Sequence, residues 1–421
     1  MEEVFLFSIY LVKIMFPMNS NNSINATNKN KTILFVYIGP FYPVLGGIER
    51  ITDTLTKSFI RKGYRVLYLV FEGKVKLATT YDYPAPLFFF PNCDFHSLEN
   101  IEFYHQFLKE QKVDIVINQS GSFPESKLFL NTGDADVKKI SVLHCCPRMA
   151  YNHLFTEYKC FLLSRNFINK LFYIFCIVPL FPFWKLWVWL KNKNHYRFFS
   201  NKTDYVCLLS DKFKGELLSI CPINENKIIS IPNPNSFTLP QCPEKKKKQL
   251  IYVGRLEMIQ KRPDRLLKVW GKICKEFPEW ELKFIGDGKL RIWMEKEVAK
   301  KKLLRVTFEG YKPSEPYYEE SSIFCLTSNF EGWGMVLTEA MQYGCVPVTF
   351  NSYRSVKDII TPGRNGMLVK PFDLNEYADK LRVLMRDNKT REKMSYNGFE
   401  DVKRFDAERV VKQWIDFFEK I

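Results

Sequence analysis

Residues 32–63 read TILFVYIGPFYPVLGGIERITDTLTKSFIRKG, and this stretch decides the fold class. It opens with an uninterrupted apolar run over 32–39, which is typical of a parallel strand buried on both faces. A loop with two adjacent glycines follows, and apolar residues then recur at helical spacing until Gly63. This order of strand, glycine-bearing loop and helix predicts the first βα unit of a doubly wound α/β domain.

The same alternation continues along the chain and restarts once. Before the restart, further strand candidates lie at 64–71, 113–118, 139–144, 204–209 and 228–231. After a Pro- and Lys-rich linker, strand candidates lie at 250–253, 281–285, 305–308, 322–326 and 346–349, with helical patterns at 263–276, 289–302 and 335–343. The two series predict two facing doubly wound α/β domains over residues 32–235 and 250–403, and a C-terminal helix over 404–421. Because ligands bind beyond the carboxyl ends of such strands, we expect the two domains to enclose one cleft.

The composition is that of a globular protein from a reducing compartment. The chain has 421 residues, of which 46% are apolar and 16% aromatic, and a disordered chain lacks such contents. Its 11 cysteines are scattered and odd in number, and its five histidines do not cluster. We therefore predict reduced thiols in a cytoplasmic protein, and neither a disulfide framework nor a bound metal.

The formal net charge of +16 has three interpretations, which are nucleic acid, an anionic membrane surface and a phosphate-bearing substrate. No helix-turn-helix, zinc-finger or RNA-recognition motif stands out, and the four lysines at 245–248 are typical of a solvated linker. We therefore expect no nucleic-acid partner, although a non-enzymatic nucleic-acid binder remains the alternative of a different class.

Two apolar stretches bear on membrane contact. Residues 4–17 are shorter than the roughly 20 residues of a membrane span. We interpret residues 1–31 as an apolar leader with an Asn-rich spacer, not as a secretory signal. The stretch 171–190 is long enough to span, but two prolines and Lys185 interrupt it. It belongs to an aromatic and basic insert at about 161–200, which suits the membrane interface, while a buried helical hairpin is the alternative.

Glycines and cations follow the first strand of each predicted domain. Gly46 and Gly47 allow a close approach of the backbone to a ligand, and the helix after them favours an anion, but a plain tight turn explains them as well. In the second domain, Gly254 and Arg255 follow the strand and Lys261 lies six residues further on. Two such cations can clamp a diphosphate, or they can be two exposed loop charges.

The strongest local signal is residues 330–344, FEGWGMVLTEAMQYG. Seven residues separate Glu331, in a glycine-rich turn, from Glu339, in the helix that begins near Gly334. Free amides at that helix start can receive phosphate oxygens. The two carboxylates need not form an acid–base pair, because they can instead accept hydrogen bonds from hydroxyls at the two ends of a sugar nucleotide. Carboxylates that are favoured only by the helix dipole are the alternative.

Together these motifs resemble the retaining GT-B glycosyltransferases of family 4. The resemblance covers roughly residues 32–420, and its specificity comes from the order and spacing of several motifs. These are Gly46-Gly47, His144, Ser210, Ile231-Pro232-Asn233, Gly254-Arg255 with Lys261, Glu331 with Glu339, Asp358, and Asn365-Gly366. Arg262 and Trp333 depart from the residues that are common in the family, but neither departure removes a charge or a carboxylate.

The resemblance implies two Rossmann-like domains, with the C-terminal helix crossing back to the N-terminal, acceptor-binding domain. It implies a nucleotide-diphosphate sugar as co-substrate, most often of UDP, no other cofactor and no metal. The acceptor would be a glycan or a lipid-linked glycan in surface polysaccharide or lipopolysaccharide assembly. From the basic excess and the aromatic stretch at 171–190 we expect a cytoplasmic enzyme with peripheral contact to the anionic inner face of the cell membrane.

The resemblance also implies residue roles. Arg255 and Lys261 would neutralise the departing diphosphate, while Glu331 and His144 would contact the donor sugar. Retention without a firm nucleophile implies attack on the front face, in which the leaving phosphate accepts the proton of the acceptor. The residues that would bind the rest of the donor are Gly46, Gly47, Gly334, Met335, Val336 and Glu339, the last one through the ribose.

Three further considerations remain. A GT-A enzyme that holds a metal with Asp134 and Asp136 is a rival, as is other GT-B sugar-nucleotide chemistry such as epimerisation. If residues 171–190 crossed a bilayer, the two predicted domains would lie on opposite sides of it, and His144 could not meet Arg255. We therefore expect this stretch to dip into the membrane and return to the same side, or to pack against the protein.

Overall fold

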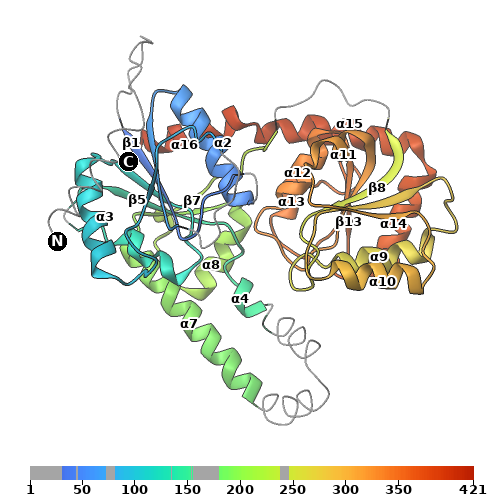
Figure 1. The fold of residues 1–421 in the computed structure, drawn as a ribbon, viewed down its shortest axis with the longest axis horizontal. Helices are drawn as coiled ribbons and strands as arrows, with labels where there is room; N and C mark the ends of the chain where they lie inside the picture. Colours follow the sequence, from blue (N-terminus) through green and yellow to red (C-terminus); the bar gives the residue numbers. More distant parts are fainter. Residues whose placement is uncertain are drawn as a thin grey trace.

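The computed structural model describes residues 31–43, 46–72, 81–133, 135–152, 154, 180–237 and 246–421. Two α/β units lie side by side, and each is built on one parallel sheet (Figure 1). This arrangement confirms the predicted fold class of two doubly wound units.

The first unit is built on a seven-stranded sheet with the order β3-β2-β1-β4-β5-β6-β7. Its strands are β1 (Thr32–Tyr37), β2 (Arg65–Val70), β3 (Leu87–Phe89), β4 (Ile115–Asn118), β5 (Lys138–Leu143), β6 (Tyr205–Leu208) and β7 (Ile228–Ser230). All pairings are parallel, and Val36 of β1 lies opposite Asn118 of β4. The loops after these strands therefore leave the sheet at the same edge, where a ligand site is expected.

Helices cover both faces of this sheet, which is why strand β1 is an apolar run and not an alternating one. The helices of the unit are α2 (Gly47–Arg61), α3 (Leu98–Glu110), η1 (Pro124–Leu130), α4 (Met149–Asn152), α7 (Phe181–Lys202), η4 (Asp211–Phe213), α8 (Lys214–Ile220) and η5 (Glu225–Lys227). Helix α2 buries Ile51, Leu55 and Phe59, spaced by four residues, in the main core. This packing fixes the start of α2 beside the end of β1.

The second unit is built on a six-stranded parallel sheet with the order β10-β9-β8-β11-β12-β13. Its strands are β8 (Lys247–Val253), β9 (Glu281–Ile285), β10 (Val306–Gly310), β11 (Ser321–Leu326), β12 (Val346–Phe350) and β13 (Met367–Val369). Its helices are α9 (Pro263–Ile273), α10 (Arg291–Lys300), α11 (Glu315–Glu320), α12 (Met335–Gln342), α13 (Val356–Ile359), α14 (Leu374–Arg386) and α15 (Asn388–Val402). A second core, which includes the fully buried Trp270 and Trp280, lies within this unit.

The C-terminal segment returns to the first unit, as the resemblance implied. After α15, a short 3-10 helix, η6 (Lys403–Phe405), leads into α16 (Ala407–Phe418), which lies along α2 (Figure 1). The ring of Phe418 is 5.5 Å from that of Phe59, and Glu408 pairs with Arg61. One chain segment therefore ties the two units together.

Some expectations need correction or fall outside the described residues. Strands β3 and β13, which have three residues each, were not predicted, whereas the equally short edge strand β7 was predicted at 228–231. The helix expected over 263–276 ends at Ile273. The predictions for residues 1–30 and for 171–179 lie outside the described residues.

The aromatic and basic insert contributes a long helix. Helix α7 extends away from the first unit, and its C-terminal half packs on that unit through His195, Tyr196 and Phe199 (Figure 1). Among the residues that the structure describes, no helix has both the length and the apolarity needed to cross a membrane.

Candidate active site

The candidate site lies where loops of the two units touch. Gly332, in the turn before α12, packs against the end of β5, and a Cβ atom at this position would lie 1.7 Å from the carbonyl oxygen of His144. Burial raises the pKa of the neighbouring Cys145 thiol to about 11, and the charge of Glu331 adds to this rise. His144 of the first unit and Glu331 of the second are thus brought together.

Glu331 is held by a network within its own unit. Its carboxylate accepts hydrogen bonds from Lys261 Nζ at 2.8 Å, Ser328 Oγ at 2.6 Å and Gln260 Nε2 at 3.1 Å. Glu331 is only 6% exposed, so this nearly dry ion pair is stronger than a surface pair. Lys261 was predicted to contact the diphosphate and Glu331 the donor sugar; in the structure the two side chains pair directly.

Arg255 joins the same network through one intermediary. Its guanidinium donates to Gln260 Oε1 at 3.2 Å, and the amide of the same Gln260 donates to Glu331. The loop that carries Arg255 packs tightly, because a Cβ at Gly286 would lie 2.1 Å from the carbonyl oxygen of Gly254. Arg255 itself is exposed at the surface of the loop, where it can reach a ligand.

Glu339 lies apart from this network and has partners from several elements. Its carboxylate accepts from Arg50 of α2 at 2.9 Å and from Ser236 at 2.9 Å, and Tyr318 Oη donates to its other oxygen at 3.3 Å. It is 3% exposed. The carboxylate expected to bind ribose is therefore engaged by a cation of the opposite unit in this state.

His144 is a neutral acceptor in this environment. Its Nε2–H donates to Gln119 Oε1 at 2.6 Å, and burial lowers the pKa of the ring to about 4. Within the described residues its buried Nδ1 atom has no hydrogen-bond partner. That lone pair is the kind of group that accepts a hydrogen bond from a sugar hydroxyl.

The N-terminal ends of α12 and α2 present the backbone amides that were predicted to bind phosphate oxygens. Gly334 caps α12 with a φ of 93°, a left-handed conformation that favours glycine, and Met335 and Val336 follow in the first turn. At α2, Gly46 is the cap residue before Gly47. The amide groups of such first turns have no partner within the helix, so both starts attract anions.

A carboxylate already lies at the start of α2. A Cβ at Gly46 would meet the side chain of Glu49, which shows that this carboxylate folds back over its own helix start. Burial raises the pKa of Glu49 above its ordinary value. A diphosphate that binds here has to displace Glu49.

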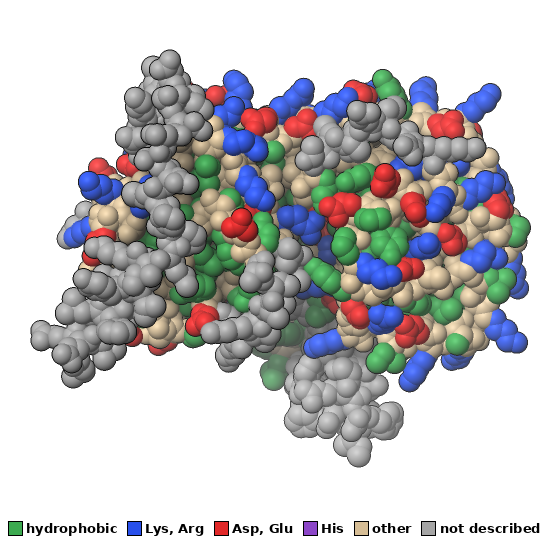
Figure 2. All heavy atoms as spheres, turned by 45° about the horizontal axis from the view of Figure 1, so that its top comes forward, with side chains coloured by type: hydrophobic (Ala, Val, Ile, Leu, Met, Phe, Trp, Pro, Cys, Tyr) green, Lys and Arg blue, Asp and Glu red, His purple; other side chains and the backbone are tan. Residues whose placement is uncertain are grey.

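A cavity of about 810 Å³ lies between the two units. It is bordered by Cys146, next to the His144 turn, and by Phe330, next to Glu331. Four cations contribute to its wall, namely Arg148, Lys212, Arg354 and Lys357, against one carboxylate, that of Glu216. Figure 2 shows Lys and Arg side chains at the junction of the two units. The cavity is therefore suited to an anionic molecule.

Ion pairs across the junction hold the two units in register. Arg354 pairs with Glu216 at 3.3 Å, and Ser210 and Lys212 both contact the carboxylate of Asp358. Ser210 and Asp358 belong to the motifs on which the resemblance rests. The contact between Ser210 and Asp358 joins the two units, a role that was not predicted from the sequence.

Several residues of the site were not predicted from the sequence. Arg50, Gln119 and Gln260 each contact one of the singled-out side chains. Gln119 follows strand β4, and Gln260 is adjacent to Lys261, so their positions after strands or beside cations were available as signals. Arg50 had no signal of this kind, because its partner is distant in the sequence.

The rival metal site gains no support from geometry. In the ranges that the structure describes, no group of three or more His, Cys, Asp or Glu side chains is arranged to hold a metal ion. Asp134, which the GT-A interpretation requires, lies outside those ranges.

The fold consists of two parallel α/β units and a helix that returns from the second unit to the first, with acidic and basic residues at the junction. These features are typical of two-domain enzymes that act on nucleotide sugars. Two family descriptions match the chain, "Glycosyltransferase Family 4" over residues 45–234 and "Glycosyl transferases group 1" over residues 240–401. The chain belongs to this family, the retaining family 4 glycosyltransferases with the GT-B fold.

Individual relatives are more distant. An uncharacterized glycosyltransferase of Haemophilus influenzae is 32% identical over 198 residues, which is 45% of this chain and 54% of that protein. A poly(glycerol-phosphate) alpha-glucosyltransferase of Bacillus subtilis is 26% identical over 187 residues, 44% of this chain and 28% of that protein. The chain thus spans about half or less of the length of these two relatives.

Among solved structures, the fold is similar to that of Anabaena HepE in complex with UDP and glucose. The TM-score is 0.69 at 15% identity, and the match covers 93% of this chain and 100% of that chain. At this identity the likeness shows the fold alone.

Proposed function

We propose that this chain transfers a sugar from a nucleotide-diphosphate donor, with UDP as the nucleotide, to a glycan or lipid-linked acceptor with retention of anomeric configuration. One observation carries the proposal, which is that Arg255, Gln260, Lys261 and Glu331 form one connected network beside His144. Family membership and the similarity to a UDP-bound relative support the choice of donor.

The network fits the charges that develop during transfer. As the bond between the anomeric carbon and the phosphate oxygen breaks, negative charge grows on the diphosphate, and Arg255 and Lys261 stabilise it. Glu331 holds hydroxyls of the donor sugar, and the neutral His144 accepts a hydrogen bond from the same sugar. The acceptor hydroxyl attacks the same face, and its proton passes to the departing phosphate.

Donor binding requires rearrangements that the contacts define. Ribose hydroxyls that donate to Glu339 compete with Arg50 for its carboxylate oxygens, and phosphates compete with Glu49 for the start of α2. Both residues belong to α2, so a small movement of this helix relative to the second unit serves both ends. Closure of the units around the donor would then exclude water from the reacting bond.

The acceptor belongs in the cavity of about 810 Å³ between the units. Its lining includes Cys146, two residues after His144, and Phe330, directly before Glu331, and its excess of cations favours an acceptor that carries phosphate. The name of the Bacillus relative, which acts on poly(glycerol-phosphate), supports an acceptor of this chemistry.

The test is donor turnover in matched lysine variants. Lys261→Ala should reduce the release of UDP from UDP-sugars by about 100-fold or more, because one preorganised charge at the leaving group is lost. Lys268→Ala is the control, since Lys268 pairs with Asp264 on the nearby α9 at 3.4 Å without reaching the network. Glu331→Ala should give a loss of similar size.

The outcomes separate the rival chemistries. Turnover that survives EDTA supports the metal-independent reaction, and anomeric configuration read by NMR tests retention. Near-normal turnover in Lys261→Ala, or an altered donor sugar in the absence of any acceptor, would count against the proposal.

A further inference from the structure

The exposed part of helix α7 carries an apolar stripe. Phe183, Leu186, Trp187 and Leu190 follow the spacing i, i+3, i+4, i+7, so they lie on one face of the helix. Their exposed fractions range from 44% to 70%. The stripe is therefore a surface of large apolar side chains that the described protein leaves open to solvent.

The same helix has charge of one sign. Between Phe181 and Lys202 the sequence contains five Lys or Arg residues and no Asp or Glu. The ammonium group of Lys191 lies over the ring of Trp187 at 5.2 Å, and that of Lys193 lies over Trp189 at 5.0 Å. Aromatic rings and cations in this combination suit the boundary between lipid headgroups and acyl chains.

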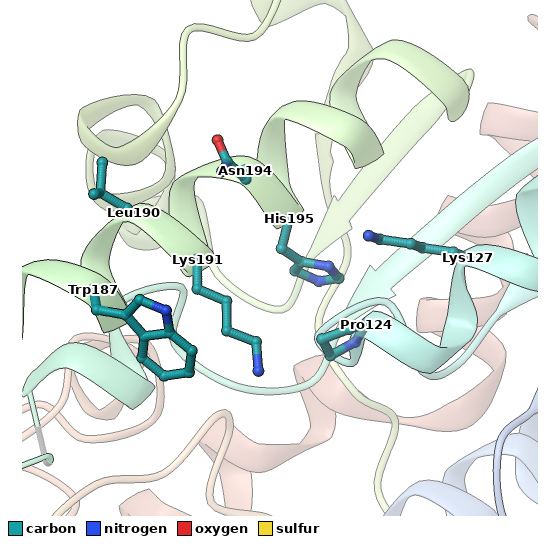
Figure 3. A pocket seen from close by; sticks show the side chains of 7 residues that line it. All are labelled: Pro124, Lys127, Trp187, Leu190, Lys191, Asn194 and His195. Atoms are coloured by element: carbon teal, nitrogen blue, oxygen red, sulfur yellow. The ribbon is translucent and has the colours of Figure 1, made fainter. Parts of the chain in front are cut away.

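A cavity of about 330 Å³ lies at the base of the stripe. It is lined by Pro124, Lys127, Trp187, Leu190, Lys191, Asn194 and His195. Figure 3 shows Lys127 pointing its ammonium toward the His195 ring, while Lys191 extends from α7 toward Pro124. Two cations from different elements therefore converge on one small cavity.

Neither cation is neutralised by the protein around it. In the described part of the chain, Lys127 and Lys191 contact aromatic rings, those of Phe198 and Trp187, and form no ion pair. His195 is 95% buried at the cavity wall, and within the same residues its Nδ1 atom has no partner. Its Nε2–H donates to the carbonyl of Gly121 at 3.4 Å. Burial lowers the pKa of His195 to about 4; the charge of Lys127 adds to this lowering and that of Glu125 opposes it.

The cavity is next to the candidate active site. Gln119 contacts His144, and two residues further on the carbonyl of Gly121 contacts His195. A single short loop therefore separates the sugar-transfer site from the cavity under the stripe.

We propose that α7 docks on an anionic bilayer, with the stripe among the acyl chains and a lipid headgroup phosphate held between Lys127 and Lys191. This inference deepens the proposed function, because it places the transfer site beside the surface that carries a lipid-linked acceptor. A second copy of the chain is a poorer occupant, because two helices of like charge on chains of +16 would repel each other.

The experiment measures flotation of the full chain with vesicles of phosphatidylcholine alone and with one quarter phosphatidylglycerol. Binding should require phosphatidylglycerol. Lys127→Gln with Lys191→Gln should weaken it about 10-fold or more. Phe183→Ser with Trp187→Ser should weaken it to a similar extent, because apolar area no longer inserts.

Matched controls lie on α10 of the second unit. Lys296→Gln with Lys300→Gln removes the same charge from exposed positions, and Ile292→Ser with Trp293→Ser removes an exposed apolar pair. Both controls should bind vesicles as the unchanged chain does. Equal losses in the lysine variant and its control would overturn the phosphate site, and equal binding to neutral vesicles would overturn the docking.

Two readouts keep the proposals separate. Sedimentation of the chain alone should show a monomer, and a dimer that Phe183→Ser with Trp187→Ser dissociates would assign the stripe to a second copy instead. Thermal stabilisation by UDP should be the same in all four variants and the unchanged chain. Selective vesicle binding without any UDP stabilisation would uphold the docking and reject the proposed donor.

Discussion

At the residue scale, the two carboxylates of the 330–344 stretch have different environments. Glu331 has a cation and two neutral donors from its own unit, so its geometry is organised before any donor arrives. Glu339 shares its charge with Arg50 of the other unit. Whether the carboxylate of Glu339 is paired with Arg50 therefore depends on how closely the two units approach each other.

The buried His144 should make the stability of the fold depend on pH in the acidic range. Burial lowers its pKa from 6.5 to about 4, so between these values the unfolded chain binds a proton that the folded chain does not. The free energy of unfolding should therefore fall as the pH falls, by about 1 kcal/mol per pH unit through this one group. Urea titrations of the unchanged chain and of His144→Asn at pH 7, 6 and 5 measure the effect.

The variant isolates the histidine from other titrating groups. His144→Asn keeps a neutral polar side chain, so its stability should decline less steeply over the same pH interval. Parallel declines in both proteins would assign the acid sensitivity to other groups.

At the scale of elements, the turn before α12 and the end of β5 touch so closely that glycine is required. The observation is the 1.7 Å approach that a Cβ at Gly332 would make to the carbonyl oxygen of His144. The turn before α12 follows the buried strand β11, and the contacting residue His144 follows the buried strand β5. Neither segment can move away from the other without disturbing a packed core. The contact fixes how the two halves of the candidate site face each other.

Gly332→Ala should force these elements apart. We expect a loss of sugar transfer of about 100-fold, because displacements of about 1 Å near a reacting centre are that costly, with a cooperative unfolding transition retained. Gly398→Ala on α15 is the control, since a Cβ there would come no closer than 3.5 Å to another atom. Turnover and thermal unfolding are measured for both variants, and unchanged turnover in Gly332→Ala would contradict the tight contact.

At the scale of the whole molecule, helix α16 makes the two units one cooperative structure. Its apolar side chains join the main core, which also contains residues of both sheets. Phe418 is 1% exposed and packs on Phe59 and Tyr64. Helix α16 therefore covers α2, the helix that follows β1.

Phe418→Ala should lower the free energy of unfolding by about 3 kcal/mol or more, because it leaves a cavity between α16 and α2. Tyr396→Ala is the control, since Tyr396 on α15 is 58% exposed. Denaturant unfolding followed by tryptophan fluorescence measures both. A small effect at Phe418 would mean that α16 is held elsewhere.

The sequence by itself determined the fold class, most of the strands and the choice of candidate site residues. Buried parallel strands such as β1 and β8 show their apolar pattern locally, whereas of the three-residue strands β3, β7 and β13 only β7 was predicted. The charged residues of the site were found because they follow strands or begin helices, positions that local patterns reveal.

Only the tertiary structure decided which of these residues meet. Arg50 and Glu339 are 289 residues apart, and His144 contacts Gln119, which follows the neighbouring strand β4. The same holds for the return of α16 and for the cavity beneath α7. Such contacts arise when separate elements pack, and no periodicity within one element encodes the identity of its distant partner.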